Sequence, residues 1–126
     1  MATAAAAVPA VATPPVSTEA VVISQATVDG IDYITRRITL QPGGNTGWHY
    51  HDGQTFAVVR GGTITRTMAD CAEVVTGPDT GITEEAGMVH IARNLGPVPA
   101  EVWVLRIAPA GTPWAVDVPS PGCGIP

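Results

Sequence analysis

Short runs in which apolar and polar residues alternate, separated by Gly and Pro, make up most of the chain. The clearest run is DYITRRITL at residues 32–40, where Ile34, Ile38 and Leu40 fall on one face of an extended strand. This period of two is that of a half-buried strand, because successive side chains point to opposite faces of a sheet. No segment keeps the 3.6-residue period of a helix beyond one or two turns. The pattern therefore predicts an all-β protein.

Further strands are predicted along the chain, with loops where Gly and Pro gather. The predicted strands are AVVISQATV (20–28), QTFAVVR and TITRTM joined as a hairpin by Gly61 and Gly62 (54–68), a short strand in CAEVV (71–75), MVHIARN (88–94) and AEVWVLRIAP (100–109). QPGGNTG (41–47) and the stretch up to residue 87 are predicted loops, and the end of the chain is mostly extended coil. Several short strands with turn signals between them predict a sandwich, a barrel or a jelly roll.

The length of 126 residues and the 45% hydrophobic content are those of one domain with a real core. The domain is expected at residues 19–126. Residues 1–18 carry no charge and no aromatic residue, so they are expected to form a disordered or loosely held arm. The small-x-small sequence Ala10-Val11-Ala12 is compatible with a trimmed signal peptide, although no positively charged segment precedes it.

The charge balance bears on the partners. The chain has no lysine, and six arginines face eleven acids for a net charge of −5. This balance argues against a nucleic-acid surface and against an anionic membrane. No apolar run approaches the ~20 residues of a membrane-spanning helix. The expected partner, a small molecule, follows from the candidate metal site described below, and a homodimer remains open.

Two cysteines, Cys71 and Cys123, lie outside the predicted core pattern. They are either unrelated small side chains or the partners of a disulfide that pins the end of the chain. A bridge would suit a secreted or periplasmic protein, and its absence a cytoplasmic one. The sequence leaves both pairing and compartment open.

The sequence spends two of its three histidines within GWHYHDGQ, residues 47–54. On a strand, His49 and His51 project to one face and Tyr50 to the other. His90 belongs to a different predicted strand. Two imidazoles on one strand and one on another can make a facial three-nitrogen site for Fe, Mn, Cu, Ni or Zn. Gln54 is a further candidate beside them, as a weak ligand or as a neighbour of the ligands.

The stretch GGNTGWHYHDGQTFAVVRG resembles the first motif of the cupin superfamily. That motif reads Gly, five residues, His-x-His, three or four residues, Glu, six residues, Gly. Gly43, His49 and His51 match it, and Gly61 follows Gln54 at the expected distance. The resemblance implies a jelly-roll β-barrel, in agreement with the strand pattern.

The stretch GMVHIARN is similar to the end of the second cupin motif through Gly87, His90 and Asn94. The resemblance covers residues 32–109 and implies that His49, His51 and His90 are metal ligands. Its usual fourth ligand, a glutamate, falls on Gln54, with a gap of two residues after His51.

Glu84 and Glu85 stand in the predicted loop before His90 and are interpreted as solvated carboxylates rather than ligands, with a carboxylate at the mouth of the barrel as the alternative. A divalent ion held by three neutral imidazoles alone keeps its full charge and is a strong Lewis acid. Three-histidine cupin sites of this kind resemble those of dioxygenases, so dioxygenase-type chemistry is the favoured hypothesis. A non-redox isomerase or lyase, and a metal-containing binding module without turnover, are the alternatives. Arg36 shares the inward face of its strand with Ile38 and is a candidate anchor for a carboxylate substrate.

Overall fold

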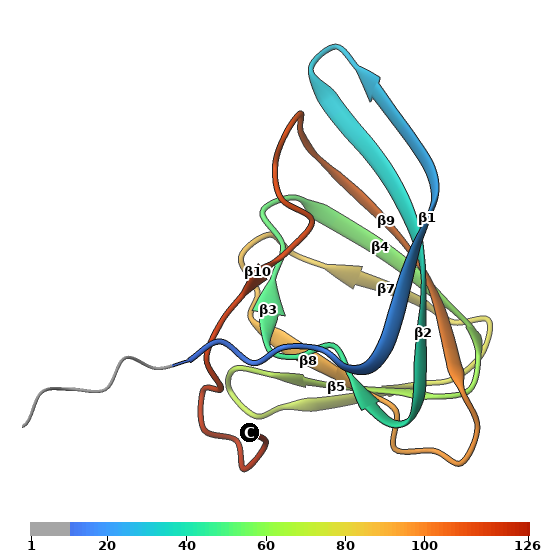
Figure 1. Cartoon of the computed structure of the whole chain (residues 1–126), viewed down its shortest axis with the longest axis vertical. Coiled ribbons are helices and arrows are strands. Elements are labelled where there is room, and N and C mark those ends of the chain that lie inside the picture. The colour runs from blue at the N-terminus through green and yellow to red at the C-terminus, as the bar shows by residue number, and fades with distance from the viewer. Residues whose placement is uncertain (1–10) are drawn as a thin grey trace, which may run out of the picture.

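The computed structural model describes residues 11–126, which form antiparallel strands and no helix (Figure 1). The ten strands are β1 (Val16–Val28), β2 (Ile31–Asn45), β3 (His49–Tyr50), β4 (Gln54–Gly61), β5 (Ile64–Met68), β6 (Glu73–Thr76), β7 (Gly81–Glu84), β8 (His90–Arg93), β9 (Ala100–Pro109) and β10 (Val116–Asp117). Over this range no helix is long and apolar enough to span a membrane. The all-β prediction is confirmed.

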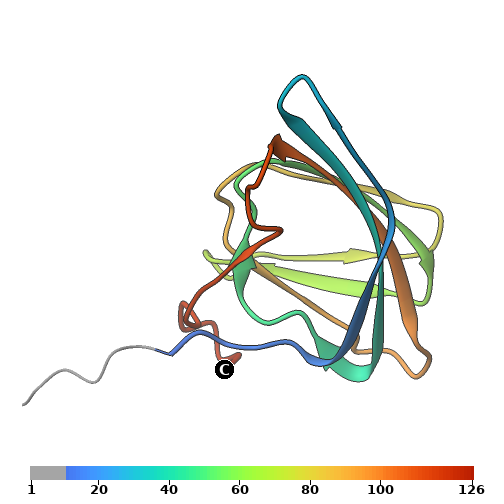
Figure 2. The same ribbon diagram turned by 45° about the horizontal axis from the view of Figure 1, so that its top comes forward.

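The strands form one strongly curved sheet that closes into a nearly complete barrel. Its main order is β10-β3-β8-β2-β9-β4-β7, with β1 added to β2, and β5 and β6 added beside β8. The long strand β2 pairs with β9 over residues 31–40 and reaches β8 at Asn45, opposite Arg93, so it belongs to both sides of the barrel. Figures 1 and 2 show the β1–β2 hairpin projecting beyond the rest of the barrel. The predicted jelly-roll barrel is therefore confirmed.

The core lies between the two sides of the barrel and follows the alternation of the sequence. Leu40 from β2 is buried with apolar residues of the strands around it: Val59, Ile64, Ile82, Ala100, Val102 and Val104. Ile34 is also buried and Ile38 packs against the core, whereas Arg37 on the opposite face of β2 is exposed. The period-two pattern thus assigned the inward face of β2 correctly.

The predicted hairpin at residues 54–68 is wrong in its pairing. Strand β4 pairs with β7 and β9, and β5 pairs with β6 and β8. The glycines between them carry the chain from one side of the barrel to the other. Gly62 has a φ of +67°, and a Cβ there would lie 2.7 Å from the Pro99 carbonyl oxygen, so only glycine fits.

Two predicted loops also contain strand. Residues 41–45 continue β2, and residues 81–84 form β7. Of the expected arm at residues 1–18, residues 1–10 lie outside the described part. Residues 16–18 belong to β1, and the Thr13 amide donates to the Val118 carbonyl over 3.3 Å. The beginning of the described chain therefore lies against its last segment.

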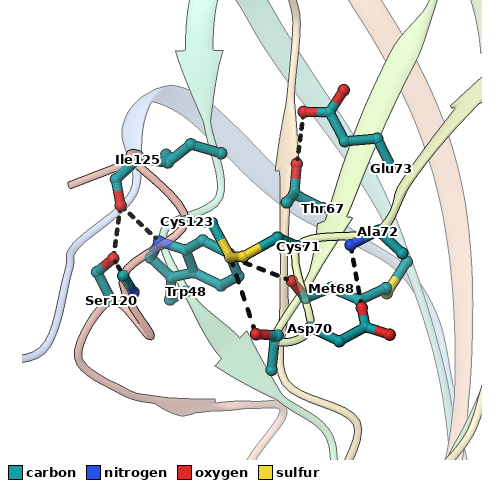
Figure 3. Close-up of a disulfide and its surroundings, with 12 residues drawn as sticks. Trp48, Thr67, Met68, Asp70, Cys71, Ala72, Glu73, Ser120, Cys123 and Ile125 are labelled. Atoms are coloured by element: carbon teal, nitrogen blue, oxygen red, sulfur yellow. Dashed lines mark hydrogen bonds between the residues drawn. A yellow bond between two sulfur atoms is a disulfide. The ribbon is translucent and has the colours of Figure 1, made fainter.

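A disulfide joins Cys71, which follows β5, to Cys123 near the end of the chain, with the two Cα atoms 5.4 Å apart (Figure 3). The buried Trp48 lies beside it, and its indole Nε1–H donates to the Ile125 carbonyl over 3.2 Å. The Val118 amide also donates to the Trp48 carbonyl over 2.9 Å. The sequence left this pairing open, and the structure places the tail against the residue that precedes His49.

Candidate metal centre

His49, His51 and His90, called the histidine cluster below, meet inside the barrel. His49 in β3 lies directly opposite His90 in β8, with ring centroids 4.3 Å apart. His51, two residues after His49, has its ring centroid 4.9 Å from that of His49 and 5.6 Å from that of His90. All three are buried, and one ring nitrogen of each lies within 4.8 Å of those of the other two. The arrangement can hold a metal ion.

Each imidazole is fixed by a backbone carbonyl. The Nδ1 atoms of His49, His51 and His90 lie 2.8–2.9 Å from the carbonyl oxygens of Gly47, Trp114 and Met88, respectively. A carbonyl oxygen only accepts hydrogen bonds, so each Nδ1 carries the proton and donates it. In the neutral ring the lone pair is then on Nε2, which is the arrangement that orients metal-binding histidines.

Glu84, at the end of β7, brings a carboxylate to the histidine cluster. Its Oε2 lies 3.1 Å from Nε2 of His90 and 3.4 Å from Nε2 of His51, and the side chain is buried. Lone pairs on Nε2 and Oε2 repel at this distance unless a proton or a metal ion lies between them. Two donors each about 2.1 Å from one ion and at right angles to each other would be about 3.0 Å apart. The donor set therefore fits a divalent transition metal.

Electrostatics keep the site ready for a cation. Burial, followed by the charge of His90, lowers the pKa of His49 to about 4, so this imidazole is neutral at pH 7. Burial by itself raises the pKa of Glu84, but contacts with His51 and His90 outweigh it and hold that pKa well below its usual value. Oε1 of Glu84 also lies 3.6 Å from Nη1 of the buried Arg66. The buried site thus combines the neutral imidazole of His49 with the charged carboxylate of Glu84.

Glu84 was missed at the sequence level, where it was interpreted as a solvated loop carboxylate; the structure corrects this. It lies in a strand of four residues, opposite Thr55 of β4, and points inward with Ile82 two residues before it. The spacing of Ile82 and Glu84 would have placed both side chains on the inward face of a strand. The composition of this stretch predicted a loop, so the spacing was not interpreted in that way.

Gln54 does not join the histidine cluster. It is exposed at the start of β4, while the next residue, Thr55, is buried and faces Glu84 across the sheet. The turn before it needs glycine, because a Cβ at Gly53 would lie 2.3 Å from the Ile107 carbonyl oxygen. This close contact with β9 sets the register that turns Gln54 outward.

A cavity of about 190 Å³ opens from the histidine cluster. The histidines and Glu84 line one part of it, and its walls are mostly apolar: Ile38, Ala57, Ala92, Val104 and Trp114. Arg36 also lines the cavity, as its position on the inward face of β2 predicted. Trp114 was not singled out in the sequence, since it lies in the coil before β10, yet its carbonyl also holds His51.

The fold and this centre define a class of small β-barrel proteins with a cluster of histidines inside the barrel that can hold a metal ion. Residues 36–106 match the family model described as "Cupin domain", so the chain belongs to the cupin family. The resemblance noted in the sequence is confirmed. Cupins commonly bind metal, in keeping with the cluster of three buried histidines.

Solved structures similar to this chain share its fold. The polyketide cyclase RemF from Streptomyces resistomycificus has a TM-score of 0.66 at 18% identity, over 86% of this chain and 76% of its own. An uncharacterised double-stranded β-helix protein from Klebsiella pneumoniae has a TM-score of 0.66 at 21% identity, over 83% and 84%. A recombinant oxalate oxidase in complex with glycolate has a TM-score of 0.58 at 16% identity, over 73% and 54%. No match was found among curated protein sequences.

Proposed function

We propose that this cupin is an enzyme that uses one divalent transition metal to act on a small molecule. The observation that carries the proposal is the convergence of three Nε2 atoms and one carboxylate at a cavity. His49, His51 and His90 would hold the metal, with Glu84 as the fourth donor. A metal bound there supplies a Lewis acid for a substrate oxygen or, if it is redox-active, a centre for chemistry with oxygen.

The other residues of the site would prepare the reaction. Each imidazole donates its Nδ1–H to a backbone carbonyl, which holds the ring in its metal-binding orientation. No free energy of reorganisation is then needed when the substrate reacts. Arg66 balances part of the charge of Glu84. Apolar walls keep water away from the reacting atoms, which strengthens every charge interaction in the cavity.

Within this class, dioxygenase-type chemistry remains the first proposal, with Fe or Cu as the metal. The carboxylate of Glu84 supports a second proposal, a non-redox isomerase or lyase with Mn or Zn. A carboxylate that is held charged beside the metal can accept a proton from a carbon next to a substrate carbonyl. The structural neighbours include a polyketide cyclase and an oxalate oxidase, which is in keeping with activity on a small molecule but favours neither reaction type.

Metal analysis of protein purified without added metal is the first test. About one equivalent of a transition metal per chain in the wild type, and none in His90→Ala, is the expected result. Wild-type protein with no affinity for any of these metals would contradict the proposal.

Two assays then separate the reaction types. Oxygen uptake by the iron-loaded protein with a small β-diketone such as 2,4-pentanedione supports the dioxygenase. Deuterium exchange into the methyl group of pyruvate without oxygen, catalysed by the zinc- or manganese-loaded protein, supports the isomerase or lyase. His90→Ala supplies the background rate in both assays. A ligand that is retained but unchanged in both would indicate a binding module instead.

A further inference from the structure

Arg36 is a cation that faces the cavity without an acidic partner. Its guanidinium carbon lies 4.3 Å from the ring centroid of Trp114. Among residues 11–126 no carboxylate lies within 4.0 Å of it, and its Nε atom is inaccessible to solvent and has no hydrogen-bond partner. A guanidinium that rests on an aromatic face keeps its N–H donors free at its edge. Arg36 is therefore available to bind an anion.

A second cation stands behind it. Arg106 in β9 is fully buried and lies on the same inward face as Arg36, two register pairs away across the β2–β9 ladder. Its Nη1 donates to the Pro113 carbonyl over 2.8 Å, but Nε and Nη2 have no partner. Its guanidinium carbon is also near Trp114, 5.6 Å from the ring centroid. Burial and the charge of Arg106 both lower the pKa of Arg36.

The nearby acids leave this positive region largely uncompensated. Asp32 interacts with Arg106, but its carboxylate accepts hydrogen bonds from Thr27 and the Gly111 amide and makes no ion pair with Arg106 within 4.0 Å. Glu84 contacts the histidines and Arg66. Asp117 lines the cavity but is exposed to solvent, which weakens its field. An anion in the cavity would supply the missing counter-charge.

We propose that the cavity takes a small monocarboxylate, with Arg36 as its anchor. The carboxylate accepts hydrogen bonds from the free edge of the Arg36 guanidinium. The body of the molecule lies against the apolar side chains of Ile38, Ala57 and Val104, and its other end faces the histidine cluster. Arg36 is the one guanidinium among the described residues that line the cavity, and the other walls are mostly apolar, so the cavity suits a ligand with one negative charge. A phosphate dianion needs more hydrogen-bond donors than the cavity offers. The binding of the carboxylate by Arg36 does not depend on the proposed function. Only the reaction of the other end of the ligand, at the histidine cluster, rests on it.

The test compares carboxylates with neutral amides of the same shape. Calorimetry or NMR titration measures the Kd of benzoate against benzamide and of butyrate against butyramide. Each pair is titrated against protein treated with EDTA and against protein loaded with zinc. We expect the wild type to prefer the carboxylates about ten- to a hundredfold, the range of a charge-assisted hydrogen bond in a largely dry site. The preference should be present without metal.

Variants at two arginines decide whether Arg36 is responsible. R36Q should abolish the preference for carboxylates, and R36K, which keeps the charge but loses the fork of donors, should keep part of it. R60Q is the matched control, because Arg60 is exposed and lies 5.5 Å from the ring centroid of Trp103 outside the cavity. It should bind the four probes as the wild type does. Far-ultraviolet circular dichroism checks that each variant is folded.

Three results would overturn the proposal. They are the absence of carboxylate binding in the wild type, an undiminished preference in R36Q, and a loss as complete in R36K as in R36Q, which would trace the effect to packing on Trp114. The outcomes also separate this proposal from the proposed function. An Arg36-dependent preference in a protein that binds no metal keeps the anion site and removes the metal enzyme. Metal binding without a preference for carboxylates keeps the proposed metal site and removes the anion site.

Discussion

Removal of the Cys71–Cys123 bond should cost a large part of the stability of this protein. The two cysteines are 52 positions apart. A cross-link mainly limits the freedom of the unfolded chain, and for a loop of this length the chain-entropy relation gives about 4 kcal/mol at 25 °C. Native-state strain and residual structure reduce such values, so we expect a loss of about 2–4 kcal/mol. A domain has a net stability of only about 5–15 kcal/mol.

Contacts that remain after the bond is lost decide how the native state responds. The tail is also held by the Trp48 indole on the Ile125 carbonyl, by the Val118 amide on the Trp48 carbonyl and by the pairing of β10 with β3. Each such hydrogen bond contributes about 1 kcal/mol net. The tail should therefore stay docked in most molecules, and the cavity wall that includes Trp114 should persist.

The assay is urea unfolding followed by tryptophan fluorescence, for metal-free wild type and the double variant Cys71→Ala/Cys123→Ala. The midpoint should fall, and the slope m should rise because the unfolded chain without the cross-link exposes more surface. A reducing agent should shift the wild type to the values of the double variant and leave the double variant itself unchanged. A difference below about 1 kcal/mol, outside the usual range for such loops, would refute the reasoning. So would two titratable thiols in denatured, unreduced protein.

Three further predictions concern the histidine cluster and the acid beside it. Replacement of His49, His51 or His90 by alanine should lower metal affinity at least about a hundredfold, since even residues behind the ligands contribute ten- to a hundredfold; competition with a chelating dye measures it, and full affinity in any two variants would exclude the three-histidine site. Glu84→Gln should weaken metal binding roughly ten- to a hundredfold in the same assay. Gln54→Glu changes an exposed residue and should leave metal affinity unchanged. A gain in affinity in Gln54→Glu with no loss in Glu84→Gln would mean that Gln54 is the fourth donor. Metal-free protein should lose stability as the pH falls from 6.5 towards 4, because the pKa of His49 is lowered from 6.5 to about 4 on folding and the unfolded chain takes up the proton first; urea midpoints at pH 7 and pH 5 should differ less in His49→Gln than in the wild type.

Local pattern was enough for the fold class and for the histidines. Alternation in residues 32–40 predicted which face of β2 is buried, because side-chain direction in a strand depends only on the period of two. The same rule put His49 and His51 side by side. The link from these two to His90 came from the spacing of the two cupin motifs, and the structure places His49 directly opposite His90.

Tertiary structure decided what depends on partners far away in the sequence. The pairing of β4 and β5 with other strands follows from barrel closure, which no local turn signal reports. The outward direction of Gln54 follows from the contact of Gly53 with β9, because a shift of one residue reverses the face of a strand. Glu84 reaches the histidines because β7 pairs with β4, and a strand of four residues has too few positions for a pattern. The three histidines of the centre were therefore visible in the sequence, whereas its carboxylate depended on strand pairing in three dimensions.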